Sequence, residues 1–141
     1  MTEFEEWKAA GRVGRIKLNK VPGYHDAADI YYLQDGKLYG KKDRELKGSW
    51  SRDPRYPYRQ VTLRLKDGSQ KHKRKCRIIA AAFVDGHLPG YEVDHIDGNK
   101  SNDAPTNLEW VTRAENMRRV HADTKQLAWN REELEQEGER A

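Results

Sequence analysis

Three polar residues in the second half of the chain have the side-chain types that phosphodiester hydrolysis needs: Asp94, His95 and Asn116. Such a reaction requires an activated water, a cation that neutralises charge on the phosphate, and groups that hold both in line. Asp94 offers Mg²⁺ a hard carboxylate oxygen and Asn116 offers a neutral carbonyl oxygen, which leaves coordination positions for water and phosphate. His95 suits the role of base, because imidazole ordinarily titrates near neutrality.

The spacing of these residues predicts how they are held. Residues 91–96 alternate as a strand does, and successive strand side chains point to opposite faces. The Asp94 carboxylate can therefore face a cation while the His95 imidazole faces a water. Thr112 stands three residues before a glutamate, a capping-box spacing that predicts a helix with Asn116 in its first turn.

A polar loop, residues 97–106, separates this strand from a second short strand expected over residues 108–111. Its opening Asp-Gly-Asn is a turn sequence. We expect Asn102, Asp103 and Asn107 to tie the loop backbone together through side-chain hydrogen bonds. The apolar support beneath the loop is expected from Ile96, Leu108, Trp110 and Val111.

Positive charge is concentrated upstream of these residues. Residues 41–77 hold 14 Lys or Arg against 4 Asp or Glu, whereas the chain as a whole has a net charge of only +4. Such a segment is typical of proteins that bind a polyanion, because each neutralised phosphate releases condensed counterions. A solvated basic surface is the alternative. The residues expected to contact DNA are Lys71, Lys73, Arg74, Lys75 and Arg77.

Hydrophobic patterning predicts the elements that carry these groups. We expect a helix over residues 2–10, then an irregular stretch over 11–29. Two β-hairpins with Asp-Gly turns follow, one pairing residues 30–33 with 37–39 and one pairing 61–65 with the basic strand 71–76. A loop over 47–58 joins the hairpins, and the alanine-rich run 78–84 predicts a buried helix that ends near Gly86.

Length and composition restrict the class of protein. A chain of 141 residues, 35% of them hydrophobic and 35% charged, fits a single small core with a highly charged surface. The sequence has no apolar run long enough to span a bilayer and no signal-peptide pattern, so we expect a soluble, cytoplasmic protein with no membrane partner. The single cysteine, Cys76, excludes an intrachain disulfide and is more typical of a small buried side chain than of a nucleophile.

The whole pattern resembles the HNH, or ββα-metal, endonucleases, in particular the phage and intron-encoded homing subgroup. The resemblance is carried by residues 93–103, which read VDHIDGNKSND, and continues through NLEWVT at 107–112 to Glu115 and Asn116. Upstream, residues 56–58, 61–65 and 76–83 are similar to the segment that precedes the family's nuclease motif. About 65 residues are covered. Cys76 stands where the family often has histidine.

The resemblance implies a role for each matched residue. Asp94 corresponds to the first metal ligand and His95 to the general base. Asn107 matches the central asparagine, which holds the loop and helps to orient the histidine. Asn116 matches the final metal-binding position, and the implied cofactor is Mg²⁺, for which Mn²⁺ can substitute.

The implied fold class is α+β, a ββα-metal nuclease motif with a basic N-terminal β-hairpin region. We divide the chain into an N-terminal region over residues 1–55, a nuclease domain over 56–124 and a C-terminal helix and acidic tail over 125–141. The ββα-metal core of the nuclease domain is expected over about 91–123.

The expected function is hydrolysis of double-stranded DNA by a metal-dependent endonuclease, with one Mg²⁺ and His95 as base. Phage homing enzymes suggest a phage-encoded protein that acts in the bacterial cytoplasm. A DNA-binding protein with a catalytically silent HNH fold is the alternative from a different class, and RNA binding or cleavage is a third possibility that the same basic segment would serve. Nicking and double-strand cutting, and monomer and dimer, are equally compatible with the sequence.

Overall fold

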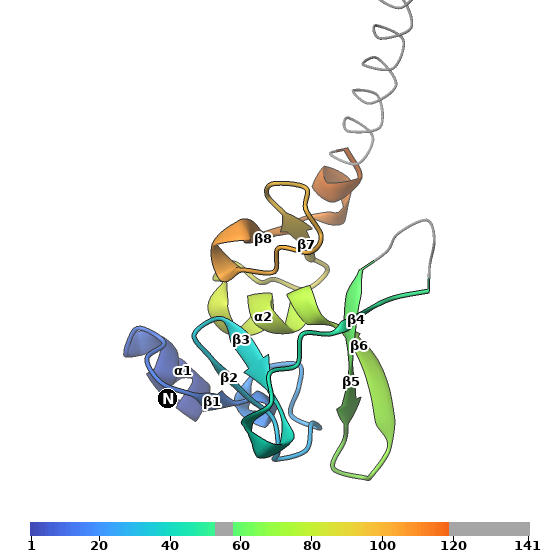
Figure 1. Ribbon diagram of the computed structural model, residues 1–141. Coiled ribbons are helices and arrows are strands. Elements are labelled where there is room, and N and C mark those ends of the chain that lie inside the picture. The colour runs from blue at the N-terminus through green and yellow to red at the C-terminus, as the bar shows by residue number, and fades with distance from the viewer. Residues whose placement is uncertain (53–57, 119–141) are drawn as a thin grey trace, which may run out of the picture.

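The computed structural model describes residues 1–52 and 58–118 and has the expected α+β composition (Figure 1). Its helices are α1 (Glu3–Ala9) and α2 (Lys75–Phe83), with short 3₁₀ turns η1 (Leu18–Lys20), η2 (Lys41–Asp43) and η3 (Pro105–Asn107). Its strands are β1 (Ile16–Lys17), β2 (Tyr32–Gln34), β3 (Lys37–Tyr39), β4 (Ser49–Trp50), β5 (Arg59–Arg64), β6 (Gln70–Arg74), β7 (Glu92–His95) and β8 (Leu108–Val111). A further helix occupies residues 113–118 at the end of the described chain. No helix within the described ranges is long and apolar enough to cross a membrane.

The first sheet has the order β1-β2-β3, and its β2–β3 hairpin confirms the first predicted hairpin. Asp35 and Gly36 both have positive φ, 52° and 78°, as a type I′ hairpin turn requires. A Cβ atom added to Gly36 would lie 2.9 Å from the Cδ atom of Pro105. The tip of this hairpin therefore lies against the loop that leads into β8, and only a glycine leaves room for the contact.

The second sheet has the order β4-β5-β6, and β5 and β6 form the second predicted hairpin. Its return strand is shorter than expected, because β6 ends at Arg74 and α2 begins at Lys75 instead of Ile78. Starting the helix at Lys75 places Cys76 on the same helix face as Ile79, Ala80 and Phe83, which follow it by three, four and seven residues. The free energy gained by burying that helix face outweighs the strand preference that the sequence pattern predicts for residues 75 and 76.

The N-terminal helix α1 is capped as predicted. The backbone N–H of Glu5 donates to Thr2 Oγ1 at 3.2 Å, and the Glu5 carboxylate accepts from the Thr2 backbone N–H at 3.3 Å. Its buried Phe4 and Trp7 face the rest of the protein, and the Trp7 ring packs edge-on against Phe83 of α2. The stretch 11–29 was expected to be irregular, but it contains β1 and η1, which are too short to produce a readable periodicity.

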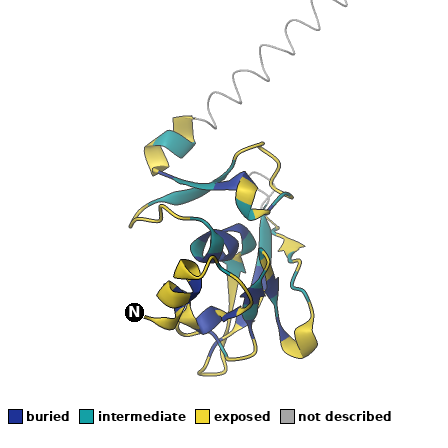
Figure 2. Cartoon of the chain, turned by 90° about the vertical axis from the view of Figure 1, so that its left-hand side faces the viewer, coloured by how far each residue is buried: buried dark blue, intermediate teal, exposed yellow. Residues whose placement is uncertain are grey.

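The central element is α2, which contacts β5, β6, β7, β8 and η3 (Figures 1 and 2). Several large aliphatic side chains around it are fully buried, and each contributes about 1.5–3 kcal/mol relative to an exposed position. These side chains are Leu18, Leu33, Leu38, Leu63, Ile78 and Ile79. One hydrophobic cluster runs from Phe4 to Leu108, so the core draws on residues from both sides of position 55. The predicted C-terminal segment 125–141 lies outside the described residues.

Candidate active site

The hairpin formed by β7 and β8 presents the candidate catalytic residues on its two faces. Its register pairs Asp94 with Glu109 and His95 with Leu108, so each pair shares a face. Leu108 is buried in the core, which places His95 on the face directed towards α2. The predicted alternation is therefore present, with the carboxylate of Asp94 on the opposite face.

Both faces meet an open cleft of about 1060 Å³ at the edge of the hairpin. Asp94, His95 and Asn116 all line this cleft, so three of the four predicted site residues reach one solvent-accessible space. Asn116 comes from the helix that follows β8, and Thr112 caps this helix by accepting a hydrogen bond from the backbone N–H of Glu115 at 3.1 Å. The helix start predicted from Thr112 is thus confirmed.

The side chain of Asn116 is held by Glu92, another cleft-lining residue. Its Nδ2 donates to Glu92 Oε2 at 2.7 Å. Glu92 and Asp94 are two residues apart on β7 and project from the same face. The face that carries Asp94 thus brings two carboxylates and one amide towards the cleft.

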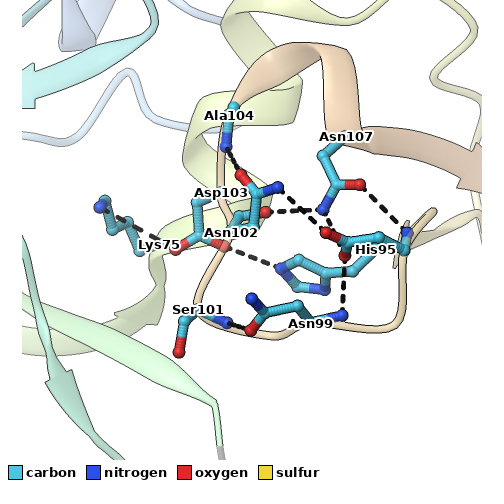
Figure 3. Close-up of polar contacts among 9 residues, drawn as sticks. Lys75, His95, Asn99, Ser101, Asn102, Asp103, Ala104 and Asn107 are labelled. Carbon is cyan, nitrogen blue, oxygen red and sulfur yellow. Dashed lines mark hydrogen bonds and ion pairs between the residues drawn. The ribbon is translucent and has the colours of Figure 1, made fainter.

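A buried carboxylate holds the ring of His95 from the side of α2 (Figure 3). Nε2 of His95 lies 2.8 Å from Asp103 Oδ1, and the two side chains are 12% and 5% exposed. Lys75 Nζ lies 3.9 Å from Asp103 Oδ2. We expected Asp103 to tie loop backbone, but its carboxylate orients the imidazole, because the loop turns this side chain inward to meet β7 and α2.

The loop itself is tied by the other predicted side chains. Asn107 accepts from the backbone N–H of Asp97 at 3.1 Å and donates to the Asp97 carboxylate and to the Asn102 carbonyl, each at 2.9 Å. Asn99 and Asn102 accept from backbone N–H groups two residues ahead (Figure 3). Hydrogen bonds from Asn99, Asn102 and Asn107 hold the pKa of Asp97 below its usual range. The bonds of Asn107 thus hold the loop, and the bond that orients His95 comes from Asp103.

One expected apolar contact is absent. Ile96 is 58% exposed, whereas Leu108 and Val111 are buried and Trp110 is partly buried. His95 faces α2, so alternation along β7 puts the next residue, Ile96, on the opposite face, the face of Asp94, and its side chain is left exposed. The support under the site therefore comes from β8.

The five basic residues that the sequence predicts to contact DNA fall into two groups, those that line the cleft and those that do not. Lys73, Arg74 and Arg77 line the cleft, and Arg74 stacks its guanidinium over the Tyr58 ring at 4.2 Å. Lys71 is exposed but is not among the cleft-lining residues. The Lys75 side chain is only 17% exposed and points to Asp103.

Cys76 lies at the start of α2 as a free, buried residue. Burial, with the nearby Asp103 charge, raises the pKa of its thiol to about 11, so the group is protonated at neutral pH and is no nucleophile. Its Sγ, a His95 ring nitrogen and an Asp103 oxygen all lie within 4.8 Å of one another.

Sequence reasoning missed three residues that line the cleft, Glu92, Lys100 and Arg113, and it gave Asp103 a role in the loop instead of beside His95. Strand alternation alone could have indicated Glu92, since it lies two residues before Asp94. No local pattern connects Asp103 to His95, because that bond depends on the path of a whole loop.

Comparison with known proteins agrees with this geometry. Residues 74–118 match a family model described as HNH endonuclease. The chain is 41% identical over 113 residues to DNA endonuclease I-HmuI of Bacillus phage SP01, an alignment that covers 79% of this chain and 55% of that protein. It is 38% identical over 69 residues to an uncharacterized HNH endonuclease, L247, of Acanthamoeba polyphaga mimivirus, covering 48% of this chain and 17% of that protein.

A solved structure of DNA binding and cleavage by the HNH homing endonuclease I-HmuI matches with a TM-score of 0.61 and 29% identity, covering 79% of this chain and 60% of that one. The ββα arrangement and the family match define an HNH endonuclease domain over residues 74–118, and the chain is similar over most of its length to an HNH homing endonuclease. It spans just over half the length of the phage enzyme that it matches.

Proposed function

We propose that this protein is a metal-dependent endonuclease that hydrolyses phosphodiester bonds of double-stranded DNA. The observation that carries the proposal is the bond between His95 and Asp103, at a cleft that Asp94 and Asn116 also line. It holds the imidazole in one orientation beside the oxygen ligands. Solvated surface histidines lack such a fixed, buried partner.

The donor atoms on the Asp94 face fit a hard divalent cation. Asn116 uses its Nδ2 to bind Glu92, so its carbonyl oxygen remains as the ligand atom of that amide. Asp94 would supply a carboxylate oxygen, and oxygen donors are what Mg²⁺ prefers, with Mn²⁺ as a substitute. When bound there, the cation neutralises charge on the phosphate and on the departing 3′ oxygen.

The bond to Asp103 gives His95 the tautomer that a base needs. An ionised carboxylate only accepts hydrogen bonds, so the ring proton resides on Nε2 and the lone pair on Nδ1. Nδ1 then takes a proton from water, the resulting hydroxide attacks phosphorus, the bond to the 3′ oxygen breaks, and that oxygen takes a proton from solvent. The products carry 5′-phosphate and 3′-hydroxyl ends.

The walls of the cleft match a DNA backbone in charge. Its basic side chains come from β6, α2, the loop and the last described helix, and neutralising phosphates with them releases counterions. They are Lys73, Arg74, Arg77, Lys100 and Arg113. The phage relative is named as a DNA endonuclease, and we infer the same substrate here, with action in the cytoplasm of a phage-infected bacterium.

A plasmid assay tests the proposal. Supercoiled DNA incubated with the protein and Mg²⁺ should be nicked or linearised, and EDTA should abolish the reaction. Asp94→Ala should abolish it as well, whereas Asp26→Ala, which removes an exposed carboxylate outside the cleft, should not. Tight DNA binding without any Mg²⁺-dependent cutting would indicate the catalytically silent fold instead. Faster cleavage of duplex RNA than of duplex DNA would indicate the RNA alternative.

A further inference from the structure

A second set of metal-binding side chains lies behind His95, on the face opposite Asp94. Cys76, His95 and Asp103 each offer one ligand atom, and these atoms lie within 4.8 Å of one another. They come from the first turn of α2, the end of β7 and the following loop. Cys76 and Asp103 are both buried, and Cys76 and His95 line the cleft, through which an ion can enter.

The chemistry of this set differs from that of the Asp94 face. A thiolate, an imidazole and a carboxylate are ligands of Zn²⁺, whereas Mg²⁺ takes oxygen ligands and has little affinity for sulfur. Asp103 Oδ2 is buried and accepts no hydrogen bond, although Lys75 Nζ stands 3.9 Å away. The second oxygen of Asp103 is thus a buried acceptor that remains available as a ligand.

We infer that Cys76, His95 and Asp103 form an inhibitory site for Zn²⁺ or a cation of similar softness. The inference rests on the proposed role of His95 as base. A cation that binds Nε2 makes the neutral ring shift its single proton from Nε2 to Nδ1, and the thiol of Cys76 releases its proton to solvent. Nδ1 is the atom that would otherwise accept a proton from water, so base catalysis stops.

The contacts around the site predict its selectivity. Mg²⁺ should not occupy this site at the concentrations that support DNA cutting, because Mg²⁺ has little affinity for a thiolate ligand. The ammonium group of Lys75 opposes a cation next to Asp103, so Lys75→Met should bind Zn²⁺ more tightly than the wild type. Inhibition should reverse when a chelator removes Zn²⁺ and Mg²⁺ is restored.

The first test measures binding of the metal alone, without DNA. The whole chain is titrated with Co²⁺, a spectroscopic substitute for Zn²⁺, and thiolate-to-cobalt absorption is recorded in the near ultraviolet. Cys76 is the single cysteine of the sequence, so such a band can come only from this site. We expect one equivalent to produce the band, and its absence would overturn the inference whether or not the protein cuts DNA.

The second test uses Cys76→Ser, which lies outside the proposed catalytic set and should keep the Mg²⁺-dependent rate. Its Zn²⁺ affinity, measured by calorimetry, should fall by more than the roughly 10- to 100-fold that loss of an outer-shell partner costs. Zn²⁺ should inhibit nicking by the wild type and spare this variant. Equal inhibition of both proteins, relieved by excess Mg²⁺, would show competition at Asp94 and would refute the site. Wild type that binds Co²⁺ through sulfur but never cuts DNA would support the site and refute the proposed function.

Discussion

The amide nitrogen of Asn116 donates a 2.7 Å hydrogen bond to Glu92, and this bond decides which way the Asn116 oxygen points. An asparagine amide can otherwise rotate to present either end. Glu92 lies on the strand that carries Asp94, so one rigid element both supplies a proposed ligand and orients the other. Outer-shell partners of this kind adjust metal affinity without touching the ion.

Replacing Glu92 should therefore weaken metal binding. We expect Glu92→Ala to raise the Mg²⁺ concentration for half-maximal nicking by about 10- to 100-fold, with partial rescue at high Mg²⁺. Glu92→Gln keeps an acceptor oxygen in the same place and should change the midpoint much less. Titrating nicking rate against Mg²⁺ checks this, and equal midpoints for all three proteins would exclude an orienting role.

Asn116 itself tests the assignment of the second ligand. Asn116→Ala should raise the metal midpoint while His95 stays in place, because one oxygen ligand is lost. Asn116→His should retain more activity than the alanine variant and should prefer Mn²⁺, since imidazole binds Mn²⁺ better than Mg²⁺. If Asn116 only supports the helix, both variants should instead melt at lower temperature with unaltered metal midpoints.

Asp103 tests whether orientation of the base matters. We expect Asp103→Ala to lower the nicking rate at saturating Mg²⁺ by about 100-fold, a typical cost of misplacing a catalytic group, with DNA affinity little changed. Asp103→Asn can still accept through its Oδ1 and should keep more activity. Nitrogen-15 spectra of labelled histidine should show the Nε2-protonated tautomer of His95 in wild type and a mixture in Asp103→Ala. Identical spectra would leave Asp103 as a structural residue only.

The basic residues that line the cleft should contribute more to DNA binding than the basic residues outside it. Arg74→Ala and Arg77→Ala should each reduce the slope of log affinity against log salt by about one unit per lost phosphate contact. Lys71→Ala is the matched control, because Lys71 belongs to the same basic strand but does not line the cleft. Binding is measured by fluorescence anisotropy on duplex DNA over a salt series, and equal slopes for all variants would make the basic run a solvated surface.

The parts of the site that could be predicted from sequence are those controlled by local rules. Strand alternation predicts that Asp94 and His95 face opposite ways, and Thr112 predicts the helix that carries Asn116. These signals act within a few residues, so the remaining fold does not alter them. The side chains of Asn102 and Asn107 tie the loop for the same reason.

The parts that could not be predicted depend on contacts between distant segments. Lys75 and Cys76 continue the basic strand in sequence but fold into α2, because burial of the helix face decides where the helix begins. The sequence predicts Asp103 only as a loop residue, because its contacts with α2 and β7 form between segments that are apart in the sequence. The close approach of Gly36 to Pro105 likewise links two segments that no local pattern connects.

The central claim is that His95 is the base of a metal-dependent DNA-cutting reaction, and its most direct test is the single-turnover nicking rate of His95→Ala at saturating Mg²⁺. His25→Ala is the control, because His25 lies outside the cleft. We predict a loss of about 10²- to 10⁴-fold for His95→Ala, with duplex affinity within a few-fold of wild type and the rate of His25→Ala unchanged. A His95→Ala protein that nicks DNA at nearly the wild-type rate would contradict the mechanism.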